Sequence, residues 1–373
     1  MPGERTEIVR KTQRVIIKVG SGLLVSLSHG LRRDFFDQLA DGIEWLRGEG
    51  KEVVLVSSGA IAAGMERLGL KQRPQSISHF QATAAVGQGI LMRLYEEAFD
   101  RKGMKVAQVL LTHEDIRERD RYLNARNTLF TLLEFGVVPI INENDSVAIE
   151  EIKFGDNDLL AALVAGLVDA QLLVILSHVE GLYEDGPQGR RVIPIVREIT
   201  PEVERVAGST SSQLSTGGML AKLRAAKIVA RLGIPMILAK GEVPEVLKRI
   251  WAGEEVGTLF LPHGKRLHGR KRWIGFHLRP KGELMVDEGA KEAILRRGKS
   301  LLPSGVKRVV GSFGRGDLVI CKDLQGEEFA RGLVNYGSEE LSRIIGKKST
   351  EIEGVLGYKY ADEVIHRDNL AVL

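Results

Sequence analysis

Short runs rich in valine, isoleucine and leucine alternate along this chain with segments long enough to form amphipathic helices. The short runs predict six strands, at residues 15–19, 53–57, 106–111, 137–141, 172–176 and 235–239. The segments between them predict helices that include residues 33–47, 77–101, 121–135, 158–168 and 219–232. This order is typical of parallel strands joined by crossover helices. We therefore expect an open, mostly parallel α/β sheet sandwiched by helices.

The size and composition of the chain are typical of a globular protein with two domains. Its 373 residues are 43% hydrophobic and 27% charged, which allows a large buried core. The formal net charge of +4 is too small to indicate nucleic-acid binding by itself. The single cysteine, Cys321, lies in an apolar run, where we expect a small buried side chain and no internal disulfide. A reducing, cytoplasmic location fits this cysteine usage.

Membrane anchors and export signals are not expected from this sequence. The longest apolar stretch, residues 159–176, is interrupted by Asp169 and Gln171, which predicts a helix followed by a strand. The first 14 residues lack the apolar core of a signal peptide. We expect neither export nor a membrane partner.

A lysine and a glycine turn follow the first predicted strand. Ligands of open α/β sheets bind beyond the carboxyl ends of the strands, so the residues after each strand are candidates for chemistry. Lys18 closes the first strand in front of Gly20 and Gly22, where a fixed cation suits an anionic group such as a phosphate. The alternative is a lysine whose stem lies on the sheet while its amino group reaches water. Taken alone, Lys18 leaves both interpretations open.

Small and polar residues follow the second and fourth predicted strands. Ser58 lies where a helix begins, so it either caps that helix or helps the free helix amides to hold a carboxylate or phosphate. After the fourth strand come Asn142, Glu143, Asn144 and Asp145, which form either a solvated turn or a binding cluster. Their position directly after a buried strand favours the binding cluster.

Two helix starts further along carry more polar groups than a helix cap requires. Residues 155–158 read Gly-Asp-Asn-Asp before an apolar helix, and one of them is expected to be its N-cap. Residues 215–222 read Ser-Thr-Gly-Gly-Met-Leu-Ala-Lys. Backbone amides there suit a nucleotide phosphate, and Lys222 suits charge that develops during transfer. An ordinary loop with a surface lysine is the alternative.

Several common phosphate and metal motifs are missing from the sequence. It contains no Gly-x-x-x-x-Gly-Lys-Ser/Thr motif, no third glycine for a dinucleotide fingerprint and no protein-kinase signature set. No Cys/His cluster has the spacing of metal ligands, so we expect no metal site built from side chains. The remaining lysines, glycine turns and acid/amide clusters suit phosphoryl transfer by positioning and charge neutralisation.

Six segments of the chain, in sequence order, resemble the glutamate 5-kinases of the amino-acid kinase superfamily: IIKVGSG, VSSGAIAAG, LNARNTL, PIINENDSV, IKFGDND and STGGMLAK. The C-terminal segment from VDEGAKEAIL to GDLVICKD resembles the PUA domain that many bacterial members carry. The likeness extends from Lys18 to about Asp368. It implies an amino-acid kinase fold, a small β-rich PUA barrel and ATP-dependent phosphorylation of the γ-carboxylate of L-glutamate to L-glutamyl 5-phosphate, the first step of proline biosynthesis.

The resemblance also implies a role for each matching residue. Lys18 and Lys222 are expected to stabilise the transferring group, and Asp158 to orient both lysines without acting as a base. The residues expected to hold glutamate are Ser58, Asp145 and Asn157. The residues expected to contact ATP are Lys18, Ser177, His178, Thr216, Gly217, Gly218, Met219, Leu220, Ala221 and Lys222. Mg²⁺ is expected to bridge the ATP phosphates, with oxygen ligands mostly from ATP and water.

Two positions depart from the family pattern. His178 stands where the family often has aspartate, and Gly22 stands where serine is frequent. The first difference bears on a nucleotide contact, and the second bears on a minor phosphate contact. Both lysines and Asp158 are retained.

The resemblance and a shift in composition predict the domain limits. We expect a catalytic domain at residues 12–262, a basic linker at 263–280, a PUA domain at 281–359 and a C-terminal tail at 360–373. Five basic residues lie between positions 265 and 272, which is typical of a solvated linker and alternatively of a polyanion-binding segment.

Three functions from different classes remain to be compared. A small-molecule kinase accounts for both lysines, both glycine turns and both polar clusters. An RNA-binding protein led by the PUA-like region accounts only for the last hundred residues or so, and the 5% aromatic content gives no evident base-stacking platform. A non-catalytic amino-acid sensor is expected to have lost a lysine or Asp158. The resemblance further implies inhibition by proline and a homo-oligomer, either a dimer or a tetramer.

Overall fold

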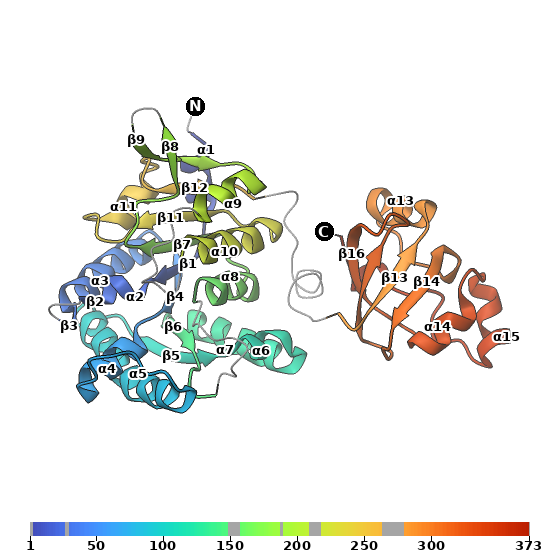
Figure 1. Cartoon of the computed structure of the whole chain (residues 1–373), viewed down its shortest axis with the longest axis horizontal. Helices are drawn as coiled ribbons and strands as arrows, with labels where there is room; N and C mark the ends of the chain where they lie inside the picture. Colours follow the sequence, from blue (N-terminus) through green and yellow to red (C-terminus); the bar gives the residue numbers. More distant parts are fainter. Residues whose placement is uncertain are drawn as a thin grey trace. The chain divides into compact units, whose positions relative to one another are not determined.

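The computed structural model of the protein describes residues 3–26, 30–147, 157–186, 189–208, 218–262 and 280–372. The chain divides into two compact units, Met1–Arg266 and Leu267–Leu373 (Figure 1). Within these described ranges, the helices lack the combination of length and apolar character that crossing a membrane requires.

The first unit is built on an eight-stranded sheet. Its strands lie in the spatial order β10 (Ile195–Val196), β12 (Thr258–Phe260), β11 (Met236–Lys240), β7 (Leu172–Ser177), β1 (Arg14–Val19), β4 (Glu52–Ser57), β6 (Val138–Glu143) and β5 (Val106–Leu111). Neighbouring strands are parallel except for the pair β11 and β12. The predicted open, mostly parallel α/β sheet is confirmed.

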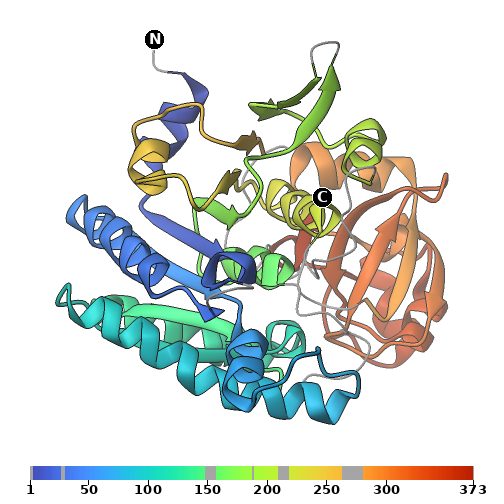
Figure 2. The same cartoon turned by 60° about the vertical axis from the view of Figure 1, so that its left-hand side comes forward.

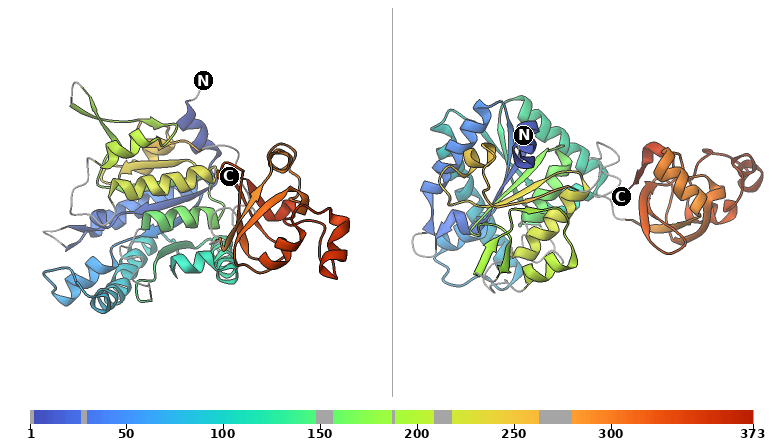
Figure 3. Two further views of the ribbon diagram at one scale, coloured as in Figure 1. Left: turned by 45° about the vertical axis from the view of Figure 1, so that its right-hand side comes forward. Right: turned by 90° about the horizontal axis from the view of Figure 1, so that it is seen from above.

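Helices cover both faces of this sheet (Figure 2, Figure 3). One face carries α3 (Arg33–Gly48), α4 (Ala60–Leu68), α5 (Ile77–Asp100) and α11 (Val246–Trp251). The other carries α6 (His113–Arg117), α7 (Arg119–Glu134), α8 (Asn157–Leu167) and α10 (Met219–Arg231). The unit also contains α1 (Glu4–Lys11), α2 (Ser21–Leu24), α9 (Pro201–Gly208) and the hairpins β2 (Val25–Ser26) with β3 (Gly30–Leu31) and β8 (Tyr183–Gly186) with β9 (Gly189–Val192).

The central strand β1 is apolar on both sides because helices cover both faces of the sheet. Val15, Ile16, Ile17 and Val19 have no exposed surface, whereas Lys18 is a polar residue that is only 5% exposed. A charged group buried in this way needs an opposite charge nearby. The position of Lys18 therefore indicates where the functional site lies.

Strand β6 continues two residues beyond its predicted end at Ile141. Asn142 and Glu143 pair in register with Leu110 and Leu111 of β5, and both polar residues are buried. The alternative of a solvated turn is wrong at these two positions. Asn and Glu are unfavourable in strands by propensity, but here Asn142 bonds Gln88 of α5 and one carboxylate oxygen of Glu143 bonds His113 of α6.

The second unit has a sheet and a buried core of its own. Its strands lie in the order β14 (Val306–Gly311), β13 (Gly282–Val286), β15 (Leu318–Lys322), β16 (Glu328–Leu333) and β17 (Leu370–Val372). Its helices are α13 (Glu288–Arg297), α14 (Ser338–Ile344) and α15 (Ile352–Leu356), with 3₁₀ turns η2 (Pro303–Gly305), η3 (Ser349–Glu351) and η4 (Arg367–Asn369). The predicted β-rich character is confirmed, and β17 comes from the residues expected to form a tail. The expected basic linker lies outside the described residues except for Pro280.

Candidate active site

Two lysines and one aspartate from three different elements meet beside the central strands. Lys18 lies near the end of β1, Asp158 in the first turn of α8 and Lys222 in the first turn of α10. Lys18 Nζ is 2.5 Å from Asp158 Oδ1, and Lys222 Nζ is 3.0 Å from Asp158 Oδ2. One carboxylate therefore holds two ammonium groups, one on each oxygen.

This lysine–aspartate cluster is buried. Asp158 has no exposed surface, and Lys18 and Lys222 are 5% and 4% exposed. Burial by itself raises the pKa of Asp158, but the charges and hydrogen bonds of Lys18 and Lys222 outweigh it and hold this pKa below its ordinary value. Asp158 is therefore ionised at neutral pH. Two cations around one anion leave an excess of positive charge that suits a phosphate.

A cavity of about 180 Å³ lies next to the cluster. Its lining comes mainly from the start of α4, the end of β6 and the start of α8, and consists of Ser21, Ser58, Gly59, Ala60, Ile61, Ala62, Met65, Arg73, Asn142, Glu143, Asp145 and Asn157. The structure thus brings Ser58, Asp145 and Asn157 together on one wall. Asn157, which lines the cavity, directly precedes Asp158 of the lysine–aspartate cluster in α8.

Hydrogen bonds fix the carboxamide of Asn157. Its Nδ2, which carries two hydrogens, lies within hydrogen-bonding distance of three acceptors: Ser57 O at 2.7 Å, Ser58 Oγ at 3.0 Å and Asn142 Oδ1 at 2.9 Å. Ser58 does not cap α4, because Gly59 is the N-cap and has a φ of 101° that glycine adopts without strain. The interpretation of Ser58 as a helix cap is wrong, and its hydroxyl contacts Asn157 instead.

Asp145 titrates near neutral pH. Burial raises its pKa to about 7, the negative charge of Glu143 contributes to the increase, and the charge of Arg73 opposes it. A cation bound at this carboxylate would favour its ionised form.

The first turn of α10 lies beside the lysine–aspartate cluster. Gly218 is the N-cap of this helix, and its backbone is extended, with φ −60° and ψ 174°. Thr216 and Gly217, which are predicted to contact ATP, lie outside the described residues. The predicted residues that belong to the helix itself are Met219, Leu220, Ala221 and Lys222.

The end of β7 carries Ser177 and His178 and borders the glycine turn after β1. Gly20 N donates to Leu176 O at 3.1 Å, which holds the turn against β7. Ser177 is buried, and His178 is exposed. Partial loss of water lowers the pKa of His178, and the charge of Lys222 lowers it further. At pH 7 the imidazole is therefore neutral.

Family models match both units of the chain. The amino acid kinase family model matches residues 13–240, and the PUA domain model matches residues 282–356. The chain belongs to the amino acid kinase family.

Proteins named glutamate 5-kinase are similar to this kinase over nearly its full length. That of Geobacter sulfurreducens is 53% identical over 99% of this chain and 100% of its own length. That of Myxococcus xanthus is 52% identical over 98% of this chain and 97% of its own length. The resemblance inferred from the six motifs is confirmed.

The amino acid kinase unit also contains two polar residues of α5, Tyr95 and Gln88, that the sequence analysis missed. Tyr95 in α5 has no exposed surface, and its hydroxyl lies 2.8 Å from Ser57 Oγ. Asn142 Nδ2 donates to Gln88 Oε1, also in α5, at 2.7 Å. A sequence signal was available, because Gln88 shares a helix face with Tyr95 and buried Leu91. Polar groups on a buried helix face need partners.

His113, which the sequence analysis also missed, pairs with Glu143 of the predicted polar cluster. The side chains of both are 2% exposed, and His113 Nδ1 lies 3.2 Å from Glu143 Oε1. His113 is the first residue of α6, where no local pattern distinguishes it from a surface histidine. The pair gives one oxygen of the buried Glu143 a partner, whereas Glu143 Oε2 and His113 Nε2 have none among the described residues.

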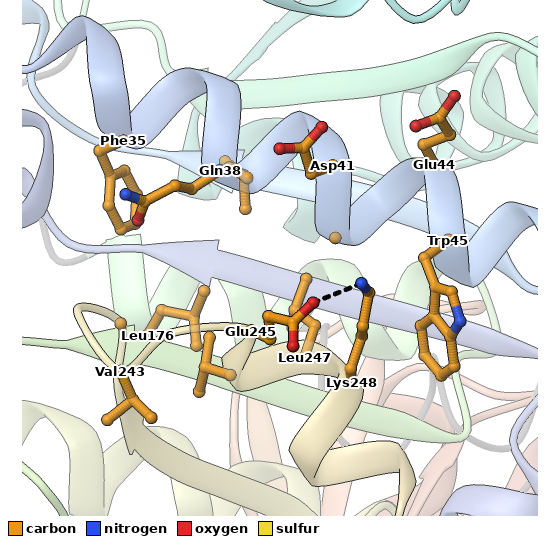
Figure 4. Close-up of a pocket in the computed structure, with 14 residues that line it drawn as sticks. Phe35, Gln38, Asp41, Glu44, Trp45, Leu176, Val243, Glu245, Leu247 and Lys248 are labelled. Atoms are coloured by element: carbon orange, nitrogen blue, oxygen red, sulfur yellow. Dashed lines mark hydrogen bonds and ion pairs between the residues drawn. The ribbon is translucent and has the colours of Figure 1, made fainter.

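A larger cavity of the kinase unit, of about 420 Å³, lies between α3 and α11 (Figure 4). Its floor is apolar and includes Phe35, Leu39 and Leu247. Glu245 and Lys248 form an ion pair at 2.5 Å on its wall. Its described lining includes none of the residues predicted to bind glutamate or ATP, so cavity size alone does not identify the active site.

Proposed function

We propose that this chain transfers the γ-phosphoryl group of ATP to the γ-carboxylate of L-glutamate and forms L-glutamyl 5-phosphate. A carboxylate oxygen of glutamate forms a bond to the γ-phosphorus, while the bond from that phosphorus to the departing ADP oxygen breaks. No proton has to be removed, because the attacking carboxylate is already ionised at neutral pH. The product is the first intermediate of proline biosynthesis.

This proposal rests on the two buried lysines, one beside each carboxylate oxygen of Asp158. Their charges offset the negative charge that the transferring phosphoryl group and the departing ADP carry in the transition state. Asp158 keeps both ammonium groups in place before substrate arrives, so they need not reorganise during the reaction. Both of its oxygens are occupied and its pKa is lowered, so it acts by orientation and not as a base.

Glutamate binds in the cavity beside the lysine–aspartate cluster. The carboxylate of Asp145 and the Oδ1 of Asn157 accept hydrogen bonds from its ammonium group. Ser58 and the backbone amides at the start of α4 line the same cavity and suit its α-carboxylate. This orientation directs the γ-carboxylate toward Lys18 and Lys222.

ATP binds through Lys18, through Ser177 and His178, and through residues 216–222. Mg²⁺ accompanies ATP and neutralises part of its phosphate charge. In the described parts of the chain, no group of three His, Cys, Asp or Glu side chains is suited to a metal ion, and lysines occupy both oxygens of Asp158. The site therefore fits Mg²⁺ held mainly by phosphate and water oxygens.

Further features follow from the family. Proline inhibits the reaction by competing with glutamate for its cavity. The protein forms a homo-oligomer, either a dimer or a tetramer. It acts in the cytoplasm. The catalytic domain spans residues 12–262, the linker 263–280, the PUA domain 281–359 and the tail 360–373.

The alternative functions have less support. A non-catalytic amino-acid sensor has no need for two buried lysines that share one aspartate. For RNA binding, a basic surface is expected, but residues 280–372 contain equal numbers of basic and acidic side chains. Neither alternative accounts for the lysine–aspartate cluster.

The test is acyl phosphate formation that depends on ATP and Mg²⁺, trapped with hydroxylamine. L-glutamate is compared with N-acetylglutamate, L-aspartate and no acceptor. Product with L-glutamate alone supports the proposal. If folded protein that binds ATP gives no product with any acceptor, the proposed function is wrong.

A further inference from the structure

Three carboxamides form a continuous hydrogen-bonded chain from α5 to the glutamate cavity. Gln88 Oε1 accepts from Asn142 Nδ2 at 2.7 Å, and Asn142 Oδ1 accepts from Asn157 Nδ2 at 2.9 Å. The three residues come from α5, β6 and α8. Gln88 is therefore linked to the cavity wall through Asn142.

Two backbone groups fix the orientation of every carboxamide in this chain. The carbonyl of Ser57 can only accept, so the group of Asn157 that faces it at 2.7 Å must be Nδ2. The amide of Glu143 can only donate, so the group of Asn142 that faces it at 2.9 Å must be Oδ1. Asn142 then presents Nδ2 to Gln88, and Gln88 must present its oxygen.

This fixed orientation leaves one acceptor of Asn157 available. Its Oδ1 is buried and has no hydrogen-bond partner among the described residues. A buried acceptor without a donor is unfavourable by about 1–3 kcal/mol. Asn157 lies 6% exposed on the cavity wall, together with the Asp145 carboxylate. An ammonium group bound in this cavity would supply the missing donor.

We propose that Gln88 is a positioning residue for the substrate ammonium group, acting through Asn142 to keep the Asn157 Oδ1 available as its acceptor. This inference rests on the proposed glutamate site. Gln88 itself makes no contact with substrate. Its loss leaves the Asn142 carboxamide held only at Oδ1, by Glu143 N and Asn157 Nδ2, so Asn142 holds Asn157 less rigidly in the orientation that presents Oδ1.

The test compares the binding of L-glutamate with that of glutarate, which has both carboxylates but no ammonium group. Gln88→Met keeps the length of the side chain and removes the acceptor, whereas Gln88→Glu retains an oxygen at the same place. Gln108→Met is the matched control, because Gln108 and Gln88 both line a further cavity of about 280 Å³, and no hydrogen bond of the Gln108 side chain is found within the described ranges. Dissociation constants are measured by calorimetry, and kcat and the KM for ATP by steady-state kinetics.

We expect Gln88→Met to raise the dissociation constant of glutamate about tenfold, or ~1.4 kcal/mol, because it removes one hydrogen bond of the chain. The constant for glutarate, kcat and the KM for ATP should each change less than twofold. Gln88→Glu should recover part of the glutamate binding that Gln88→Met loses, and Gln108→Met should bind glutamate within twofold of the unmodified protein. If Gln88→Met does not fold, Gln88→Ala is used in its place, because water can fill the space that the shorter side chain leaves.

Two outcomes overturn the inference while the proposed function stands. One is unchanged glutamate binding in Gln88→Met. The other is an equal loss of glutamate and glutarate binding, which would assign Gln88 a purely structural role. If the unmodified protein forms no acyl phosphate from glutamate, the proposed function fails first and the inference fails with it.

Discussion

Lys18 is a charged residue in the buried central strand of the sheet, where packing alone favours an apolar side chain. A lysine in a central parallel strand is unfavourable, and Asp158 makes it tolerable only by neutralising it at 2.5 Å. Apolar residues of similar volume often stabilise a core as well as or better than a buried ion pair does. A cluster of two lysines and one aspartate at this depth is therefore best explained by what it binds.

The role of Lys222 can be tested by truncation. Lys222→Ala should lower kcat by about 10²–10³-fold, because its charge matters most in the transition state, and should change the KM for glutamate less than threefold. Lys227→Ala is the control in the same helix, because Lys227 is partly exposed and pairs with Glu204. An increase in KM at unchanged kcat would contradict the assigned role.

Asp145 should make glutamate use depend on pH. The carboxyl has a pKa of about 7 in the free protein, and only its ionised form attracts an ammonium group. We expect kcat/KM for glutamate to rise with pH, about tenfold per unit below pH 7, and to level off above it. Asp145→Asn should lower kcat/KM and flatten this profile. A profile of the unmodified protein that is flat between pH 5.5 and 8 would refute the prediction.

At the scale of elements, the cavity depends on how closely α4 approaches α5. A Cβ at Gly87 in α5 would lie 1.7 Å from Ala60 O and 2.4 Å from Gly64 N, both in the backbone of α4. A Cβ at Gly64 would lie 1.9 Å from Thr83 O. Because Gly64 and Gly87 have no side chain, the backbones of α4 and α5 pack in direct contact. The first residues of α4 line the proposed glutamate cavity.

Gly87→Ala should therefore force the two helices apart. We expect a loss of about 1–3 kcal/mol in the free energy of unfolding and a lower kcat/KM for glutamate, because Ala60 lines the cavity. Gly89→Ala is the matched control in α5, since its Cβ meets nothing within 4 Å and helix propensity favours alanine by about 1 kcal/mol. Equal melting temperatures for the two variants would show that the close approach is unimportant.

At the scale of the whole molecule, the two units have separate cores. Tyr336 is fully buried in the second unit, and its hydroxyl accepts from Tyr360 N at 3.1 Å and Ala361 N at 2.8 Å. Tyr336→Phe leaves both amides without this acceptor, so we expect a loss of about 1–3 kcal/mol in the stability of that unit.

Calorimetry of the full chain should then show two transitions that respond separately. Tyr336→Phe should lower only the transition of the second unit and leave kcat unchanged, while Gly87→Ala should lower only that of the kinase unit. A single transition that shifts in both variants would mean that the units unfold together.

The sequence by itself predicted the fold class of the kinase unit and six of the eight strands of its described sheet, all but β10 and β12. Its apolar runs and helical periods predicted β1, β4, β5, β6, β7 and β11 because local burial patterns follow the period of each element. The motifs around Lys18, Asp158 and Lys222 also predicted which residues to examine. The rule that ligands bind beyond the carboxyl ends of strands predicted that they would lie near one another.

Only the tertiary structure decided which polar groups meet. Asn142 was expected just beyond a strand that ended at Ile141, yet it extends β6 and bonds Gln88, which is 54 residues away. Asn157 bonds Ser57, which is 100 residues away. Such contacts depend on the order and register of strands and on the helix packed above them, and no local pattern encodes these. Hydrophobic periodicity therefore specified the framework, while the hydrogen bonds that orient the candidate site could be assigned only once distant elements were placed side by side.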